Sequence, residues 1–279
     1  MLKIGAMNNP YNDIISEIEF IGKAKFDYID LTAEKPEASP EVIAKRRREI
    51  MEALSTFNLE VVGHTPWYLE LGHPYESVRR AFLKEALKII DILGSIEIKK
   101  ATIHPIPAML GVYKVKKYRR KMLEWMIQSI KEISKRASDY DMIIVIENLD
   151  GGKILSLENY EEIITKANCY FHLDVGHANL NLQRNMAVEF INHFGAKGLL
   201  KHVHVSDNVG GTMRGGWDLH LPIGAGKINW KEIFKALRKV GYDDTITVEV
   251  FSPDRDYLIM SKEKVKKLWE EANINMEKT

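Results

Sequence analysis

The sequence predicts a (β/α)8 fold, a closed barrel of eight parallel strands that are each followed by a helix, in one domain over residues 1–279. Short apolar runs alternate with longer amphipathic ones along the chain, and eight such pairs are present. Acidic residues and histidines repeatedly follow the apolar runs, and strand-end side chains converge when parallel strands lie side by side. An open, doubly wound sheet is the competing fold, but eight units in a chain of this length favour closure.

The predicted strands are short runs rich in Ile and Val and poor in charge, as in strands that are buried on both faces. They are Leu2–Met7, Asp27–Leu31, Glu60–His64, Lys100–His104, Met142–Glu147, Tyr170–Asp174, Leu200–Val205 and Thr245–Val250. Amphipathic runs with capping residues predict the helices. These are Asp13–Ala24, Pro40–Phe57, Tyr75–Gly94, Val115–Tyr140, Leu157–Lys166, Met186–Phe194, Trp230–Val240 and Ser261–Ala272.

Composition limits the classes of partner. With 40 basic and 39 acidic residues, the net charge of +1 gives no overall field that attracts nucleic acid. The single cysteine, Cys169, excludes an intrachain disulfide and is typical of a reducing compartment. Residues 1–7 predict a strand, not a signal peptide, and no apolar stretch approaches the roughly 18 residues that span a membrane. We therefore expect a cytoplasmic protein without a membrane partner.

Two glutamates are the strongest candidates for chemistry. Glu147 and Glu249 each follow a run of β-branched residues. An unpaired carboxylate is costly to bury at such a position, so a divalent metal ion or a basic partner is expected beside it. A structural ion pair with a neighbouring strand is the alternative interpretation.

Asp174 and His177 form a second candidate pair. Asp174 ends a predicted strand, His177 begins the loop that follows, and Gly176 permits a sharp turn between them. The alternative is an Asp that only caps the turn. In the next strand His204 is expected to reach the site, whereas His202, two residues earlier on the same face, fills a deeper layer with a hydrogen bond. Carboxylates together with imidazole suit Mn, Co, Zn or Mg.

Further aromatic residues accompany these strand ends. His64 and His104 also follow apolar runs, and each either lines the site or packs beneath it. Trp67 is expected to form an apolar wall of the site or part of the core. His172 shares the face of Asp174 and points inward. Two other histidines are expected at the surface: His73 and His193.

The segment 215–230 contains Asp218 and His220 and is long for a barrel connection, which is typical of a functional loop. Its glycines could bring backbone amides close to an anion, but the spacing matches neither a phosphate loop nor a dinucleotide site. The basic run Lys114–Lys121 predicts a solvated helix face. No serine or cysteine stands in a G-x-S-x-G nucleophile motif.

Seven segments occur in a characteristic order: VVGHTPW, ATIHP, VIENLDGG, HLDVGHAN, HVHVSDN, DLHLPIGAGKINW and TVEVF. Together they resemble the xylose-isomerase-like TIM barrel superfamily over most of the chain. That superfamily contains sugar and sugar-phosphate isomerases and epimerases. A related branch contains endonuclease IV-type enzymes that cut DNA at abasic sites.

The resemblance implies a site for one divalent ion, formed by residues that both branches share: Glu147, Asp174, His204 and Glu249. In the sugar branch it implies a small sugar or sugar-phosphate substrate and proton transfer through an enediolate by Glu147 and Glu249. His177, His64 and Trp67 would contact the substrate. The DLHLPIGAGKINW segment is similar to the sugar branch. We therefore expect an isomerase or epimerase of carbohydrate metabolism. Such an enzyme could form a homo-oligomer.

The resemblance also implies an alternative function. The nuclease branch binds three zinc ions, and this chain has a candidate for each further ligand: His64, His104, His177, Asp218 and His220. However, this chain has HVSDNV where that branch has HLNDSK, and ENLDG where it has ENTAG. These differences argue against the nuclease branch, and a multi-zinc phosphodiesterase acting on abasic DNA is kept as the alternative function. A barrel that binds a sugar without turnover is a third hypothesis.

Overall fold

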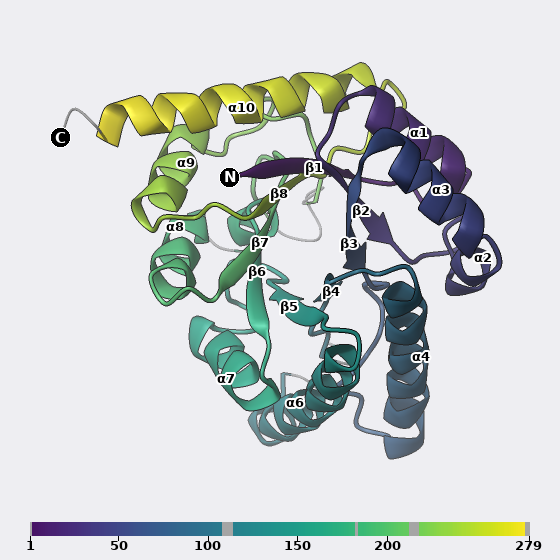
Figure 1. The fold of residues 1–279 in the computed structure, drawn as a ribbon. Coiled ribbons are helices and arrows are strands. Elements are labelled where there is room, and N and C mark those ends of the chain that lie inside the picture. Colours follow the sequence, from purple (N-terminus) through teal and green to yellow (C-terminus); the bar gives the residue numbers. More distant parts are fainter. Residues whose placement is uncertain (1, 108–113, 182–183, 212–217, 277–279) are drawn as a thin grey trace. The chain divides into compact units, whose positions relative to one another are not determined.

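The computed structural model describes residues 2–107, 114–181, 184–211 and 218–276 (Figure 1). Eight strands follow one another in chain order in a closed barrel, which confirms the predicted fold class. The strands are β1 (Lys3–Met7), β2 (Tyr28–Thr32), β3 (Glu60–His64), β4 (Lys100–Ile103), β5 (Ile143–Glu147), β6 (Tyr170–Asp174), β7 (Leu200–Val205) and β8 (Thr245–Val248). Three of them, β3, β6 and β7, have the bounds that the sequence predicts.

Helices follow the strands (Figure 1). They are α1 (Ile14–Lys23), α2 (Pro40–Lys45), α3 (Arg47–Phe57), α4 (Glu76–Ser95), α6 (Lys116–Ser138), α7 (Leu157–Ala167), α8 (Ala187–Phe190), α9 (Trp230–Lys239) and α10 (Asp256–Met276). Two short segments are a 3-10 helix, η1 (His177–Asn179), and a π-helix, η2 (Ile191–Gly195). Within the described residues, no helix combines the length and the apolar character that crossing a bilayer requires.

One compact unit contains residues 1–7, 148–157 and 171–279, and it carries β1, most of β6, β7 and β8. The strands in it pair in parallel. Asp174 on β6 lies opposite His204 on β7, and His204 lies opposite Thr247 on β8. This register places Asp174, the last residue of β6, beside His204 near the end of β7.

The other compact unit contains residues 8–147 and 158–170, with β2, β3, β4 and β5. These strands are also parallel, and Thr102 on β4 lies opposite both His64 on β3 and Val145 on β5. Gly63 allows α4 to pack closely on this layer, because a Cβ there would lie 2.9 Å from the side chain of Leu93. Most residues of these strands are buried and apolar, but Asp30 at the centre of β2 and Thr102 in β4 are buried polar residues.

The structure corrects some predicted helices. The continuous helix over residues 40–57 is wrong, since α2 and α3 are separated at Arg46, where φ is −99° and ψ is 14°. The guanidinium of Arg46 pairs there with Asp13 and with Glu49. The predicted helix over residues 186–194 divides into α8 and the π-helix η2. The C-terminal helix is longer than residues 261–272.

His73 is also not at the surface, because only 8% of it is exposed. Its Nδ1 accepts a hydrogen bond from the Tyr75 N–H at 3.1 Å, and its carbonyl accepts one from Arg79 at 3.0 Å. The ring therefore organises the turn before α4. The basic run 114–121, by contrast, lies on an exposed helix face as predicted.

Candidate functional site

Three strand ends bring together Asp174, His204 and Glu249, which we call the Asp174 group. Asp174 ends β6, His204 is the second-to-last residue of β7, and Glu249 directly follows β8; all three are buried. His204 Nδ1 lies 3.1 Å from Glu249 Oε2 and 3.9 Å from Asp174 Oδ2. One ligand atom from each residue lies within 4.8 Å of the other two, so the group could hold a metal ion.

The donor set fits a divalent ion. Ligand atoms about 2.0–2.2 Å from one ion, at angles between octahedral and tetrahedral, lie roughly 3.0–3.5 Å apart. The His204–Glu249 separation of 3.1 Å falls in this range, and the His204–Asp174 separation of 3.9 Å is slightly wider. Two carboxylates with one imidazole suit Mn, Co or Zn better than Mg.

Asn148 orients Asp174, a role that the sequence analysis missed. The Asn148 side chain donates to the Asp174 carbonyl at 2.9 Å and accepts from the Asp174 N–H at 2.7 Å. The N–H of His177 donates to Asp174 Oδ1 at 2.5 Å. Gly176 is needed for close approach, since a Cβ there would lie 2.7 Å from Ser206 Oγ. The only sequence signal for Asn148 is its position directly after Glu147.

A second set, the Glu147 group, consists of Glu147, His64 and His104. Both imidazoles place Nε2 on the same Glu147 oxygen, Oε2, at 3.2 Å for His64 and 3.1 Å for His104. The three exposed fractions are 1%, 4% and 7%. His64 Nδ1 lies 3.1 Å from the Thr65 carbonyl. Because a carbonyl only accepts, Nδ1 carries the proton, and a second proton or a cation must lie between Nε2 and the carboxyl oxygen.

A third set, the Asp218 group, has the same composition in loops. His177 Nε2 and His220 Nε2 lie 3.1 Å and 3.2 Å from Asp218 Oδ2. His177 Nδ1 lies 2.9 Å from the Asn148 carbonyl, so the argument made for His64 applies to His177 too. The side chains are 13–19% exposed. The structure therefore brings together the five outer residues that the sequence singles out, in two groups that each share one carboxylate oxygen.

Charge in the Asp218 group follows from this geometry. Burial acts to raise the pKa of Asp218, but the charge and hydrogen bond of His177, with a hydrogen bond from His220, hold it well below the usual range. Burial acts to lower the pKa of His220, but the carboxylates of Glu249 and Asp218 raise it to about 9. Without a metal ion, a proton on His220 balances these acids.

His220 connects the Asp218 group with the Asp174 group. Its Nδ1 lies 3.7 Å from Glu249 Oε2, and its backbone has a φ of 42°. The ring of Phe251 lies 4.8 Å from the His220 ring, and Phe251 is 46% exposed. Phe251 thus offers an apolar surface beside these groups, which the sequence analysis did not identify. Trp67 is 58% exposed, which excludes the core alternative for it.

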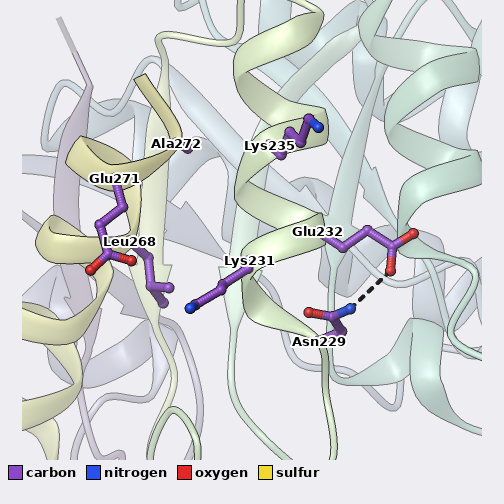
Figure 2. A pocket seen from close by; sticks show the side chains of 7 residues that line it. All are labelled: Asn229, Lys231, Glu232, Lys235, Leu268, Glu271 and Ala272. Atoms are coloured by element: carbon purple, nitrogen blue, oxygen red, sulfur yellow. Dashed lines mark hydrogen bonds between the residues drawn. The ribbon is translucent and has the colours of Figure 1, made fainter. Parts of the chain in front are cut away.

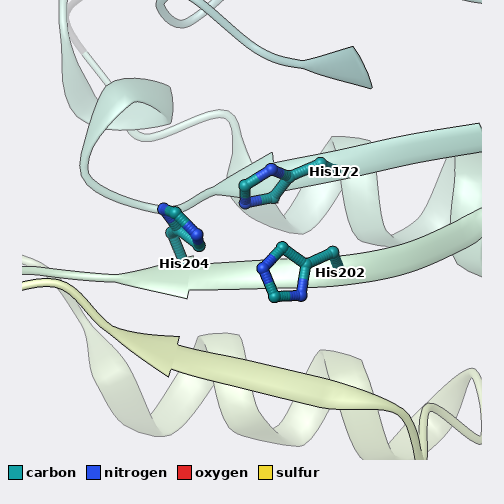
Figure 3. A group of neighbouring side chains, drawn as sticks. All are labelled: His172, His202 and His204. Carbon is teal, nitrogen blue, oxygen red and sulfur yellow. The ribbon is translucent and has the colours of Figure 1, made fainter. Parts of the chain in front are cut away.

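Two further buried histidines, His172 on β6 and His202 on β7, lie beside His204 (Figure 3). The ring centroid of His172 is 4.1 Å from that of His204 and 4.4 Å from that of His202. His202 Nδ1 lies 2.7 Å from Thr245 Oγ1. As expected, His202 therefore fills a deeper layer with a hydrogen bond. The three histidines also bring one nitrogen each within 4.8 Å of one another, but His204 Nδ1 faces Glu249.

A pocket between α9 and α10 is lined by other residues (Figure 2). It is lined by Asn229, Lys231, Glu232, Lys235, Leu268, Glu271 and Ala272. Its side chains alternate in charge and extend from the two helices, and none belongs to the three groups described above. We assign it no part in the chemistry.

Residues 18–273 match the model of the xylose isomerase-like TIM barrel family. The chain belongs to this family. An uncharacterised protein of Methanocaldococcus jannaschii, MJ1311, is 28% identical over 245 residues, which are 85% of this chain and 78% of that protein. A second protein of that organism, MJ1614, is 26% identical over 68% of this chain and 70% of its own length.

Solved structures share the fold. The structure of a D-tagatose 3-epimerase-like protein superimposes with a TM-score of 0.80 and 27% identity, covering 98% of this chain and 99% of that one. The D-psicose 3-epimerase of Clostridium cellulolyticum H10, solved with D-tagatose, has a TM-score of 0.75 and 16% identity, covering 97% and 99%. At that lower identity the likeness concerns the fold alone.

Proposed function

We propose that this protein is a divalent-metal-dependent isomerase or epimerase that acts on a sugar or a sugar phosphate. One observation carries the proposal: the Asp174 group joins two carboxylates and an imidazole at the ends of β6, β7 and β8. The likeness to a D-tagatose 3-epimerase-like protein at 27% identity supports the same reaction class.

The proposed metal ligands are Glu147, Asp174, His204 and Glu249. Glu147 ends β5, the strand before β6 in the barrel order, and the carboxyl ends of barrel strands open on one face. When bound, a divalent ion polarises the substrate carbonyl and orients the neighbouring oxygen. The Asn148 side chain holds Asp174 in place through hydrogen bonds to both its backbone N–H and its carbonyl.

The protein's own groups would move the proton. One of the two glutamates, Glu147 or Glu249, removes it from the carbon beside the carbonyl, and the other returns it to the opposite face or to the next carbon. Carboxylates suit this exchange because each can alternate between acid and base. His177, with Nδ1 fixed by the Asn148 carbonyl, would contact a substrate hydroxyl through Nε2, which faces Asp218 in this structure. His64 and Trp67 would contact the rest of the sugar.

Solvent isotope exchange tests this function. Purified protein loaded with Mn²⁺, Co²⁺ or Zn²⁺ is incubated with a panel of ketoses, aldoses and their phosphates in deuterated water. We expect deuterium at the carbon beside the carbonyl of the converted sugar, and loss of this exchange in both Glu147→Gln and Glu249→Gln. Glu52→Gln on the exposed face of α3 is the control. If both site variants still exchange the proton, the proposed mechanism is wrong.

A second candidate is a multi-zinc phosphodiesterase that acts on abasic DNA. The Glu147 and Asp218 groups favour it, because each places two imidazole nitrogens within 3.2 Å of one carboxylate oxygen. Such pairs of ligands suit zinc, and several zinc ions together can activate water and stabilise an in-line displacement at phosphorus.

Metal counting separates the two candidates. Elemental analysis of the purified chain would give one ion per chain for the isomerase and three zinc ions for the phosphodiesterase. A duplex with one abasic site provides the activity test. Three zinc ions with incision that a chelator abolishes would establish the second function, whereas one ion with sugar turnover and no incision would exclude it.

A further inference from the structure

The loop between β7 and α9 is attached to one buried carboxylate, that of Asp207. Asp207 lies two residues after β7 and has no exposed surface. Its carboxylate accepts four N–H groups. Asn208 N–H and Ile228 N–H donate to Oδ1 at 2.9 Å and 3.2 Å. Gly224 N–H and the indole Nε1–H of Trp230 donate to Oδ2, both at 2.8 Å.

The backbone of Asp207 holds the same loop. Its N–H donates to the Leu221 carbonyl at 2.9 Å, and the Leu221 N–H donates back at 2.8 Å. Leu221 directly follows His220, so this pair of bonds lies next to a residue of the Asp218 group. The Lys227 N–H also donates to the Asn208 carbonyl at 2.8 Å. Asp207 is therefore hydrogen-bonded to the described part of the loop at four residues: Leu221, Gly224, Ile228 and Trp230.

Two features indicate that this arrangement is specific. Gly226 crosses directly over the carboxylate, and a Cβ there would collide with Asp207 Oδ1 and the Asn208 carbonyl. Within the described ranges, only N–H donors and no basic side chain contact the carboxylate. A carboxylate that accepts four such bonds is fixed in position, which suits an anchor for a loop.

We propose that Asp207 is a positioning residue that fixes the loop carrying Asp218 and His220. Its carboxylate replaces regular secondary structure in this segment, and it acts on the site only through His220, whose Nδ1 faces Glu249 at 3.7 Å. The effect on turnover rests on the proposed function, whereas the effects on loop order and metal affinity do not.

The anchor is tested with Asp207→Asn, in which the amide can accept at one atom only and presents N–H to N–H at the other. Trp230→Phe removes one donor and keeps a ring, so it serves if Asp207→Asn does not fold. Asp150→Asn is the matched control. Asp150 is also fully buried and accepts the N–H groups of Gly152, Lys153 and Ile154, but it anchors the loop after β5.

Three readouts are measured on the full chain: the Trp230 indole ¹⁵N–¹H resonance, hydrogen exchange at the Gly224 and Ile228 amides, and Co²⁺ affinity by calorimetry. Asp207→Asn should shift the indole resonance, expose both amides to exchange and weaken Co²⁺ binding by about 10-fold or more, as loss of outer ligand support typically does. Trp230→Phe lacks this indole, so it is followed by amide exchange and Co²⁺ affinity alone, and both should change less in the same direction. Asp150→Asn should leave all three readouts as in the wild type.

Unchanged indole and amide signals in Asp207→Asn would overturn the proposal. Equal loss of Co²⁺ affinity in Asp150→Asn would also overturn it, because the effect would then be general destabilisation. If the wild type converts no sugar, the proposed function fails, and the exchange and Co²⁺ data still decide the role of Asp207. If sugar is converted, Asp207→Glu should restore part of the turnover that Asp207→Asn loses.

Discussion

The Glu147 group and the Asp218 group contain the same chemistry in different settings. Each has two imidazoles on one carboxylate oxygen, with nitrogen–oxygen distances of 3.1–3.2 Å. The Glu147 group comes from the ends of β3 and β5 and the residue after β4, and it is almost completely buried. The Asp218 group comes from the loops after β6 and β7 and is partly exposed. The same combination of two imidazoles and one carboxylate can thus be positioned either by the strands of a sheet or by an anchored loop.

The difference concerns what maintains the geometry. Strand register fixes the Glu147 group, because His64 is paired with Thr102 on the neighbouring strand. The Asp218 group has no such ladder, and its His220 adopts a φ of 42°, which is uncommon outside glycine. Removing a strand-end residue should therefore cost stability, whereas changing the loop should cost order at the site.

The largest expected effect is on the stability of the Glu147 group. Glu147→Gln leaves His64 and His104 without their buried carboxylate, and we expect the free energy of unfolding to fall by about 3–5 kcal/mol. Asp218→Asn, at a partly exposed site, should cost about 1–2 kcal/mol. Urea unfolding with a chelator present measures both. Equal losses would show that burial does not distinguish the two groups.

Metal removal should have the next largest effect. At a free ion concentration of 100 times the dissociation constant, one bound ion adds about 2.7 kcal/mol to the free energy of unfolding. We expect a chelator to remove this stabilisation from the wild type and to change nothing in Asp174→Asn. Asp218→Asn shows whether the stabilising ion binds at the Asp174 group or at the Asp218 group. If that variant also loses the full metal effect, the loop group binds the ion that provides the stability.

A smaller effect is expected from Gly226→Ala. The added Cβ would collide with the Asp207 carboxylate, so the loop must shift, at a cost of about 1–3 kcal/mol. Hydrogen exchange should increase in residues 218–230 and remain unchanged in β3 and β5. Gly198→Ala is a control for backbone strain without a collision, because Gly198 has a φ of 68° and nothing lies within 4 Å of a Cβ there. Identical exchange patterns in the two variants would contradict the proposed contact.

The smallest effect concerns Cys169, which reports on the strand framework. It precedes β6, is 4% exposed, and burial raises the pKa of its thiol far above the ordinary value. A raised pKa keeps the thiol protonated, so labelling by a disulfide reagent should stay slow as the pH rises from 7 to about 9. Rapid labelling of the native chain would show that the strand framework opens as easily as the loop.

The sequence analysis predicted the strand-borne part of the molecule well. The strand ends at His64, Glu147 and Asp174 are predictable because apolar runs buried on both faces end where polar residues begin. The break of the helix at Arg46 was not predictable, since no glycine or proline marks it in the sequence; Arg46 pairs there with Asp13 and Glu49. His73 was assigned to the surface because its burial arises from a turn that no periodicity indicates.

The loop-borne part was predicted only as a set of residues. The sequence singles out Asp218 and His220, but their meeting with His177 depends on backbone turns that are fixed by Asp207. Asp207 and Asn148 were missed because each contacts backbone groups from distant positions in the chain. A polar residue just after a strand end was the one available signal for both.

The pairing of β1 with β8 sets an order of events during synthesis of the protein. Lys3 is aligned with Thr245, so β1 pairs with β8 only after the residues between them have been translated. Until then the Ile- and Ala-containing edge of β1 is exposed on a nascent chain, where such edges favour aggregation. Pairing between segments so distant in the sequence is intrinsically slow to form.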